Sequence, residues 1–167
     1  SNGSVMPFFL NKKKKGEKFL PITSDKMTRF NISLQDGCEM VFNAIEKALG
    51  GEVFVPKIPS YKISVVATAI APELEQRVVG VRPGEKLHEE MITASDSYNT
   101  VDLGKYYAIL PPKSPYSQYS KDDYKKTFKG LDVPDGFSYN SGNNSDWETI
   151  ESLRELMKIH VDPNFKV

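Results

Sequence analysis

A charged turn is the most informative feature of this 167-residue sequence. It lies within residues 76–89, where a short strand is predicted to lead into the turn Arg82-Pro83-Gly84-Glu85. A guanidinium can donate two hydrogen bonds to phosphate oxygens, and a carboxylate three residues later can accept from both hydroxyls of a ribose. The turn therefore suggests a nucleotide ligand. Taken alone, it is more simply interpreted as a surface ion pair.

Arg29 is a second candidate for binding an anion. It lies at the centre of residues 27–32, which alternate as a half-buried strand would, after the polar loop 22–26. A charge between core neighbours is costly unless it is paired. Two interpretations stay open from the spacing: Arg29 binds an anionic ligand, or it pairs with a nearby Asp or Glu.

The elements that position these residues alternate between strands and helices, which predicts an α/β fold. A helix is expected from Ser4 to the stop at Gly16, and a longer one from the cap Ser33 to about residue 49. The longer helix is amphipathic, so we expect it to pack on a core with Cys38 as a small core residue. Residues 19–22 form a short apolar segment. Further elements are expected as strands at 52–55, 76–81 and 107–110, a helix capped by Ser64, and a helix at 86–91.

The last third of the chain has a different composition. Residues 111–145 are rich in Pro, Ser, Tyr, Gly and Asn, which predicts a long loop or a loosely docked tail. A capping box at residues 145–148 predicts the start of a final helix. The expected organisation is a first part at 1–110, the loop or tail at 111–145, and the helix and chain end at 146–167.

Composition argues against several classes of function. Lys plus Arg and Asp plus Glu are both 22, so no net positive field favours nucleic acid. The single cysteine cannot form an internal disulfide, no Cys/His spacing suggests a metal site, and a reducing, cytoplasmic setting is favoured. No apolar run approaches the ~20 residues that cross a bilayer, so no membrane role is expected.

Several motifs occur together in the order of one protein family. They are Gly3-Ser4-Val5, Pro7-Phe8-Phe9, Pro21-Ile22-Thr23, Met27-Thr28-Arg29-Phe30, the run Gly51 to Ser60, and the run Arg82 to Glu89. Over about residues 1–110 the chain resembles the inverting UDP-N-acetylglucosamine 4,6-dehydratases and related polysaccharide-biosynthesis dehydratases. The resemblance implies the C-terminal, substrate-binding part of an extended short-chain dehydrogenase/reductase, an NAD(P)-binding Rossmann-type protein.

The resemblance also implies roles for individual residues. Arg29 and Arg82 would hold the diphosphate of UDP-N-acetylglucosamine, and Glu85 would accept from the uridine ribose. His88 is expected to be structural or to face solvent. The substrate pocket would be lined by Pro21, Thr23, Met27 and Met6. The residues that contact NADP would be Asn2, Gly3, Ser4 and Val5. Asn2 stands where the family usually has an arginine, which weakens the cofactor contact expected there.

The residues that would perform the chemistry are missing from the sequence. No G-x-G-x-x-G motif occurs, although a Rossmann half needs such a turn for the pyrophosphate. No Tyr stands four residues before a Lys, the pair that would take a proton from the sugar hydroxyl in this family. The full-length protein is expected to be an NADP-dependent lyase, but this chain is expected to lack the N-terminal half and to be inactive alone.

Two other functions stay open. The same Arg and Glu contacts to UDP would serve a nucleotide-sugar epimerase or reductase, and upstream catalytic residues would separate these enzymes. A non-catalytic UDP-sugar-binding or assembly module is the third possibility. In each case strand edges and apolar helix faces made for a larger fold would be exposed, so we expect a homo-oligomer.

Overall fold

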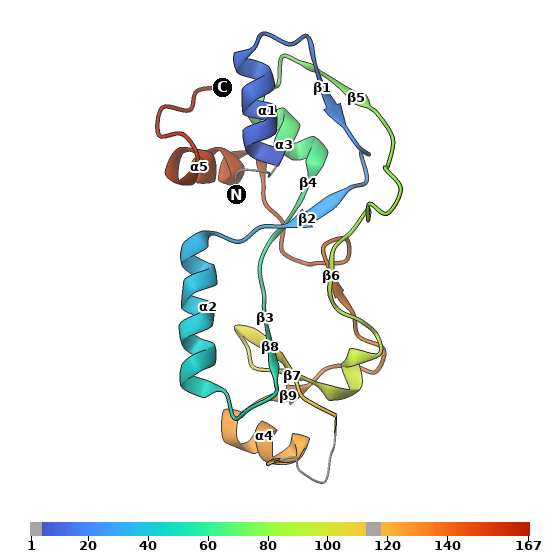
Figure 1. Ribbon diagram of the computed structural model, residues 1–167, viewed down its shortest axis with the longest axis vertical. Coiled ribbons are helices and arrows are strands. Elements are labelled where there is room, and N and C mark those ends of the chain that lie inside the picture. Colours follow the sequence, from blue (N-terminus) through green and yellow to red (C-terminus); the bar gives the residue numbers. More distant parts are fainter. Residues whose placement is uncertain (1–4, 113–117) are drawn as a thin grey trace. The chain divides into compact units, whose positions relative to one another are not determined.

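The computed structural model describes residues 5–112 and 118–167, and its contacts divide the chain into two compact units (Figure 1). The first unit combines the N-terminal segment up to Asn31 with Pro59–Glu89 and Ser141–Val167. The second unit combines Ile32–Ile58 with Glu90–Asn140. Each unit is therefore assembled from segments that are far apart in the sequence.

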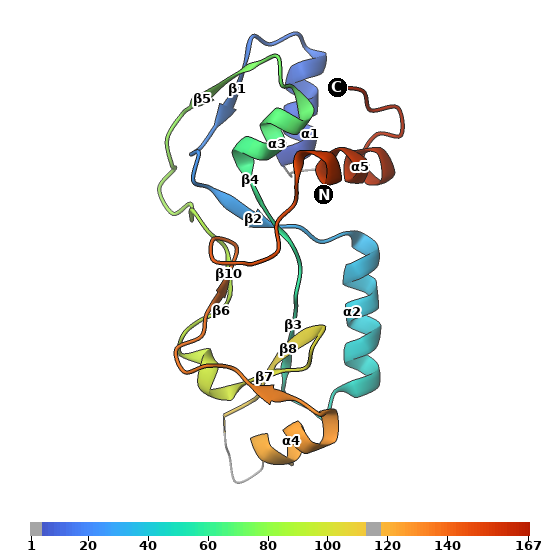
Figure 2. The same cartoon turned by 180° about the vertical axis from the view of Figure 1, so that it is seen from behind.

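The first unit has three helices and two short strand pairs in its described residues. Its elements are α1 (Val5–Lys14), β1 (Phe19–Ile22), β2 (Thr28–Phe30), β4 (Ser60–Lys62), α3 (Ile63–Ile70), β5 (Glu75–Val78) and α5 (Ile150–His160). Strand β1 pairs in parallel with β5, and β2 pairs antiparallel with β4. Helix α3 packs between α1 and α5, as Figures 1 and 2 show from opposite sides, and its buried residues form the centre of the core.

The second unit is built on an antiparallel sheet of order β3-β8-β7-β9. Its core consists of Val101, Ala108, Leu110 and Tyr124. Its elements are α2 (Leu34–Lys47), β3 (Val53–Pro56), β6 (Glu90–Ile92), the 3-10 turn η1 (Asp96–Asn99), β7 (Thr100–Asp102), β8 (Tyr106–Ile109), α4 (Lys121–Phe128), β9 (Leu131–Asp132) and β10 (Tyr139–Asn140).

The first two helices begin or end where the sequence predicts. Helix α1 carries lysines in its last turn, and Gly16 follows in the left-handed region with φ +69°. Ser33 caps α2 through a capping box with Asp36. The expected cap at Ser4 lies outside the described residues.

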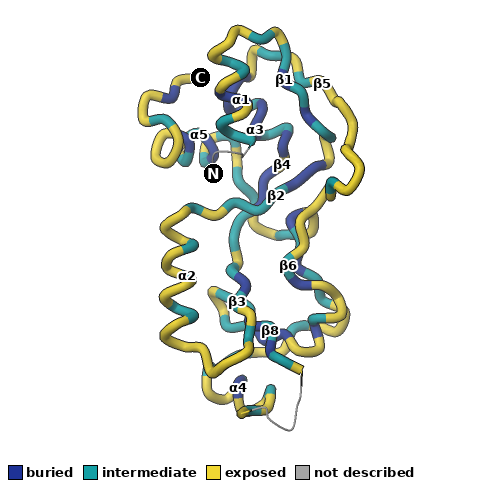
Figure 3. Tube along the Cα trace, in the orientation of Figure 1, coloured by how far each residue is buried: buried dark blue, intermediate teal, exposed yellow. Residues whose placement is uncertain are grey.

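The packing expected for α2 is wrong within this chain. None of its residues is buried, Phe42 is 70% exposed and Ile45 is 75% exposed. Cys38 is exposed as well, so it is not a core residue here. In Figure 3 the tube of α2 is yellow and teal, the colours of exposed and intermediate residues, with no dark blue. Amphipathicity predicts that a helix has a face to bury, but it cannot specify whether the same chain supplies the covering surface.

Three local predictions are also wrong. Residues 86–91 form no helix, because their backbone bonds to other segments: Leu87 accepts from the Thr28 N–H at 2.9 Å and Glu89 from the Ser141 N–H at 2.8 Å. Helix α3 starts at Ile63, so Ser64 is inside it rather than at its cap. The last helix is capped by Thr149 with Ser152, since the Glu148 N–H already donates to the Ser60 carbonyl at 2.8 Å.

The stretch expected as a loop or tail contains ordered elements. Helix α4 and the short strands β9 and β10 lie within it. Ser120 caps α4 in a box with Asp123, and Tyr124 of this helix is fully buried. The aromatic side chains of the stretch thus supply part of the core of the second unit. No helix in the described residues is both long and apolar enough to span a membrane.

Candidate functional site

The first unit contains a cleft of about 560 Å³ that gathers most of the predicted binding residues. This volume falls in the ordinary range of ligand pockets. Its wall includes Val5, Pro21, Thr23, Met27, Arg29, Arg82 and Glu85, together with Phe8, Phe9, Phe30, Tyr61, Ile63 and Glu89. Residues from three separated segments of the chain therefore meet at one place.

The backbone of β2 and β4 presents Arg29 and Tyr61 side by side. The two residues are direct partners in the antiparallel ladder, so their side chains share one face of the pair. Met27, just before β2, is 2% exposed and contributes apolar surface to the cleft wall. The register of this ladder places a cation next to a phenol.

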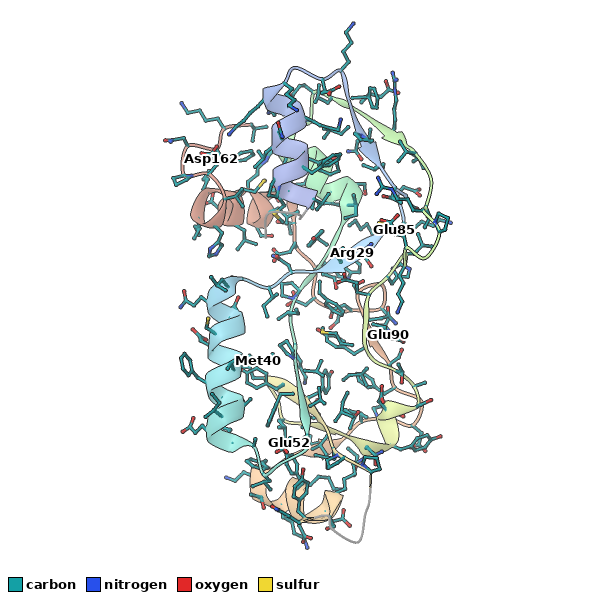
Figure 4. All side chains as sticks on the ribbon, in the orientation of Figure 1. Arg29, Met40, Glu52, Glu85, Glu90 and Asp162 are labelled. Carbon is teal, nitrogen blue, oxygen red and sulfur yellow. The ribbon has the colours of Figure 1, made fainter. Side chains whose placement is uncertain are left out.

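The guanidinium of Arg29 is held in a defined orientation. Its Nη1 donates to the carbonyls of Thr28 at 2.7 Å and Leu87 at 3.3 Å. Its Nε lies 3.5 Å from a carboxylate oxygen of Glu89, and its Nη2 lies 4.0 Å from one of Glu85. Figure 4 labels Arg29 and Glu85 at this place. Only the Nη2 end has donors that are not committed to a close partner, so the side chain offers that end to an anion.

Arg82 and Glu85 stand on the turn that the sequence predicts. The Glu85 N–H donates to the Arg82 carbonyl at 3.0 Å, and the Arg82 N–H donates to a Glu85 carboxylate oxygen at 3.2 Å. Gly84 between them has φ +80°, a conformation that glycine adopts without strain. The turn therefore fixes the distance between the backbone positions of Arg82 and Glu85.

Tyr61 and Glu89 are two wall residues that were not predicted. Burial and, to a smaller extent, the Glu89 carboxylate together raise the pKa of Tyr61 to about 12, against the lowering effect of Arg29. Tyr61 is therefore a neutral phenol near pH 7, able to donate a hydrogen bond. Glu89 ends the motif at residues 82–89 and could have been selected as a carboxylate. Tyr61 could not have been selected from the sequence, because its position beside Arg29 depends on the β2–β4 register.

Some predicted residues lie elsewhere. Met6 packs against the hydrophobic core rather than lining the cleft. Val5 reaches the cleft wall, whereas Asn2, Gly3 and Ser4 lie outside the described residues. His88 is exposed, as expected, and its Nδ1 is 2.8 Å from the Thr28 hydroxyl.

Between residues 5 and 112 and from 118 to 167, the structure has no glycine-rich turn of the kind that holds a dinucleotide cofactor. The strand β1 leads into Thr23-Ser24 instead of a glycine-rich turn at a helix N-terminus, which is what holds a pyrophosphate in a Rossmann half. What the cleft offers is two guanidinium groups, acceptor carboxylates and an apolar wall. That combination suits a ligand with phosphate oxygens and sugar hydroxyls.

The fold is that of the C-terminal part of an extended short-chain dehydrogenase/reductase. The sequence comparison identifies the family within this class. A family model described as polysaccharide biosynthesis protein matches residues 1–111, and the chain belongs to that family. The expected family and fold class are confirmed by this match and by the relatives below.

Relatives match nearly the whole chain. A UDP-N-acetylglucosamine 4,6-dehydratase (inverting) of Campylobacter jejuni is 46% identical over 158 residues, covering 94% of this chain and 47% of that protein. A UDP-glucose 4-epimerase of Rickettsia felis is 35% identical over 163 residues, covering 94% and 46%. The X-ray structure of Pen from Bacillus thuringiensis matches with a TM-score of 0.74 at 26% identity, covering 94% and 46%. The chain thus spans about half the length of these relatives.

Proposed function

We propose that this chain holds the UDP-sugar of an inverting UDP-N-acetylglucosamine 4,6-dehydratase, as the C-terminal part of that enzyme. The observation that carries the proposal is the meeting of Arg29, Arg82 and Glu85 in one cleft. The 46% identity to a dehydratase of that name over 94% of the chain supports it. The role of the protein would be in making sugars for surface polysaccharides or glycans.

Each side chain has a proposed part in binding. The Nη2 end of Arg29 and the guanidinium of the exposed residue Arg82 donate to the diphosphate. Glu85 accepts from the ribose hydroxyls, and its 4.0 Å separation from Arg29 Nη2 is a loose contact that an incoming phosphate can replace. Pro21, Thr23 and Met27 supply the wall against which the nucleotide or sugar packs.

The chemistry of the whole enzyme would need groups that this sequence lacks. In the proposed reaction C4 of the sugar is oxidised, water is eliminated across C5 and C6, C6 receives the hydride, and C5 is inverted. NADP would supply the hydride chemistry, and neither its glycine-rich turn nor the Tyr-Lys pair is present here. We therefore assign only binding and orientation to this chain, and we expect no turnover from it alone.

The proposal also includes the cellular compartment and one alternative enzyme. The single cysteine favours a reducing, cytoplasmic setting. The identity to UDP-glucose 4-epimerases favours a second candidate, the binding part of an epimerase. Both enzymes would use the same contacts to UDP, so comparing the affinities for UDP-N-acetylglucosamine and UDP-glucose separates them: the dehydratase predicts tighter binding of the first.

The test is calorimetric titration of the purified chain with UDP and UDP-N-acetylglucosamine. Losing a hydrogen bond to a charged group costs about 1.5–3 kcal/mol, so Arg82→Ala and Glu85→Gln should each weaken binding about 10- to 100-fold. Arg77→Ala is the matched control, because Arg77 is an exposed arginine of the same unit that pairs with Glu75 and stacks on Phe19 outside the cleft.

Two results would contradict the proposal. A folded sample that shows no saturable binding would mean that this chain does not hold the nucleotide. An equal loss of affinity in Arg77→Ala would mean that only the overall charge matters, and not the cleft.

A further inference from the structure

The loop that carries Arg82 and Glu85 is held at its two ends. At the upstream end the Val79 N–H donates to the Ile22 carbonyl at 2.8 Å, next to the β1–β5 pair. The residues that follow, 80–84, are exposed. At the downstream end the Leu87 carbonyl accepts from the Thr28 N–H at 2.9 Å and from Arg29 Nη1 at 3.3 Å. The positions of both binding side chains therefore depend on what fixes residues 87–89.

A chain of side-chain hydrogen bonds fixes that downstream end. His88 Nδ1 lies 2.8 Å from the Thr28 hydroxyl, and this hydroxyl lies 2.7 Å from that of Ser141. Ser141 also bonds both backbone groups of Glu89: its Oγ accepts from the Glu89 N–H at 2.9 Å, and its N–H donates to the Glu89 carbonyl at 2.8 Å. Thr28 is 2% exposed and Ser141 is fully buried, so water competes little for the bond between their hydroxyls, whereas the His88 end of the network is exposed.

Gly142 leaves the space that this arrangement needs. A Cβ atom at residue 142 would lie 2.6 Å from Nδ1, 2.7 Å from Cγ and 2.8 Å from Cε1 of the His88 imidazole. These distances are too short for a real contact, so a side chain there would push the ring away from Thr28. Gly142 is absent from the residues with positive φ, so the imidazole, and not the backbone conformation, requires a glycine.

We propose that Thr28, His88, Ser141 and Gly142 are positioning residues of the UDP site, which hold the loop 80–86 so that Arg82 and Glu85 face the cleft. The inference rests on the proposed function and adds a contribution from the last part of the chain. Ser141 and Gly142 lie beyond residue 111, where the match to the family model ends. We call Thr28, His88, Ser141 and Gly142 together the brace. A loop held in its binding conformation loses less conformational entropy when the ligand binds, so the brace raises the affinity without contacting the ligand.

The experiment measures the affinity for UDP in variants of the brace. His88→Ala and Gly142→Ala should each weaken binding about three- to tenfold, since each loses the neutral hydrogen bond between His88 and Thr28. Thr28→Val should weaken binding at least as much, because it also loses the bond to Ser141. Thr28→Ser keeps the hydroxyl and should bind like the unmodified chain. The double variant Gly142→Ala with His88→Ala should bind no more weakly than His88→Ala alone, because the ring that the new methyl group displaces is already gone.

Hydrogen exchange without ligand reports the position of the loop separately from binding. Amides of residues 85–89 should exchange faster in Gly142→Ala and Thr28→Val, and at the unmodified rate in Thr28→Ser. Thermal unfolding confirms that each variant is folded.

The outcomes distinguish this inference from the proposed function. If the unmodified chain does not bind UDP, both are overturned. If it binds UDP, and Gly142→Ala and Thr28→Val exchange faster but bind equally well, only the brace is overturned. Additive losses in the double variant would also overturn it, because they would show that Gly142 does not act through His88.

Discussion

Replacing Glu52 by glutamine should destabilise the second unit at pH 7. It should also reduce the loss of unfolding free energy that occurs when the pH is lowered into the acid range. The Glu52 carboxylate accepts from the N–H groups of Leu49 and Gly50, both at 2.7 Å, and from the hydroxyls of Tyr119 at 3.2 Å and Tyr124 at 3.4 Å. One carboxylate thus joins the turn after α2 to the helix α4 and the segment before it. Figure 4 labels Glu52 in this unit.

The size of the effect follows from the donors that glutamine would leave unpaired. Its amide group presents one oxygen and one NH2, so one of the two backbone N–H groups would face another donor. A lost hydrogen bond to a charged group costs about 1.5–3 kcal/mol. The carboxylate is partly exposed, and solvent screening reduces this to about 1–2 kcal/mol at pH 7.

The pH dependence has a definite sign. Burial of Glu52 raises its pKa, but the hydrogen bonds from Leu49, Gly50 and Tyr119 outweigh burial, and the pKa lies below its ordinary value of 4.5. A carboxyl group with a lowered folded-state pKa stabilises the fold above the unfolded-state pKa. That contribution is lost as the pH falls from about 4.5 through the folded-state pKa, and Glu52→Gln cannot lose it.

Urea unfolding followed by circular dichroism at pH 7 and pH 3 tests this, with hydrogen exchange of the α4 amides to locate the change. The free-energy difference between the two proteins should be about 1–2 kcal/mol at pH 7 and should shrink at pH 3. Glu46→Gln, an exposed carboxylate on α2, is the control and should have little effect. An equal difference at both pH values would refute the assignment to the ionised carboxylate.

Two further predictions concern a buried and an exposed apolar side chain. Leu153 is fully buried between α5 and the core of the first unit, so Leu153→Ala should cost about 2–5 kcal/mol, read from Trp147 fluorescence during urea unfolding. The matched change Ile159→Ala, at a residue of the same helix that is 68% exposed, should stay within about 0.5 kcal/mol, and equal costs would contradict the packing. The exposed face of α2 predicts that the chain self-associates, and Phe42→Lys should reduce the sedimentation coefficient while Gln35→Lys, an exposed polar residue of that helix, should not. A monodisperse monomer of the unmodified chain would refute this.

Features that depend on neighbouring residues could be predicted from the sequence. The turn at Arg82–Glu85 forms because proline and glycine restrict its backbone locally. The cap at Ser33 forms because its partner is three residues away. The family could also be recognised, because several motifs occur in the same order along the sequence as they do in the family.

The proposed binding residues lie in separate segments of the sequence, which alone could not show how they meet. From the sequence, Arg29 could equally pair with a carboxylate or bind an anionic ligand. The structure places Glu89 3.5 Å from its Nε and Glu85 4.0 Å from its Nη2, so the contact at Nη2 is the looser one. Residues 86–91 have local helical character, yet they are extended because β2 and Ser141 use their backbone groups. Long-range hydrogen bonds overrode the local preference there.

Local sequence therefore determined the turns, the caps and the chemical types of the candidate ligands for a UDP-sugar. Tertiary structure alone decided that Tyr61 stands beside Arg29, that Gly142 makes room for His88, and that α2 stays uncovered in this chain. The physical reason is that a turn or a cap closes over three or four residues, whereas these contacts depend on strand register and on which distant segment packs nearby.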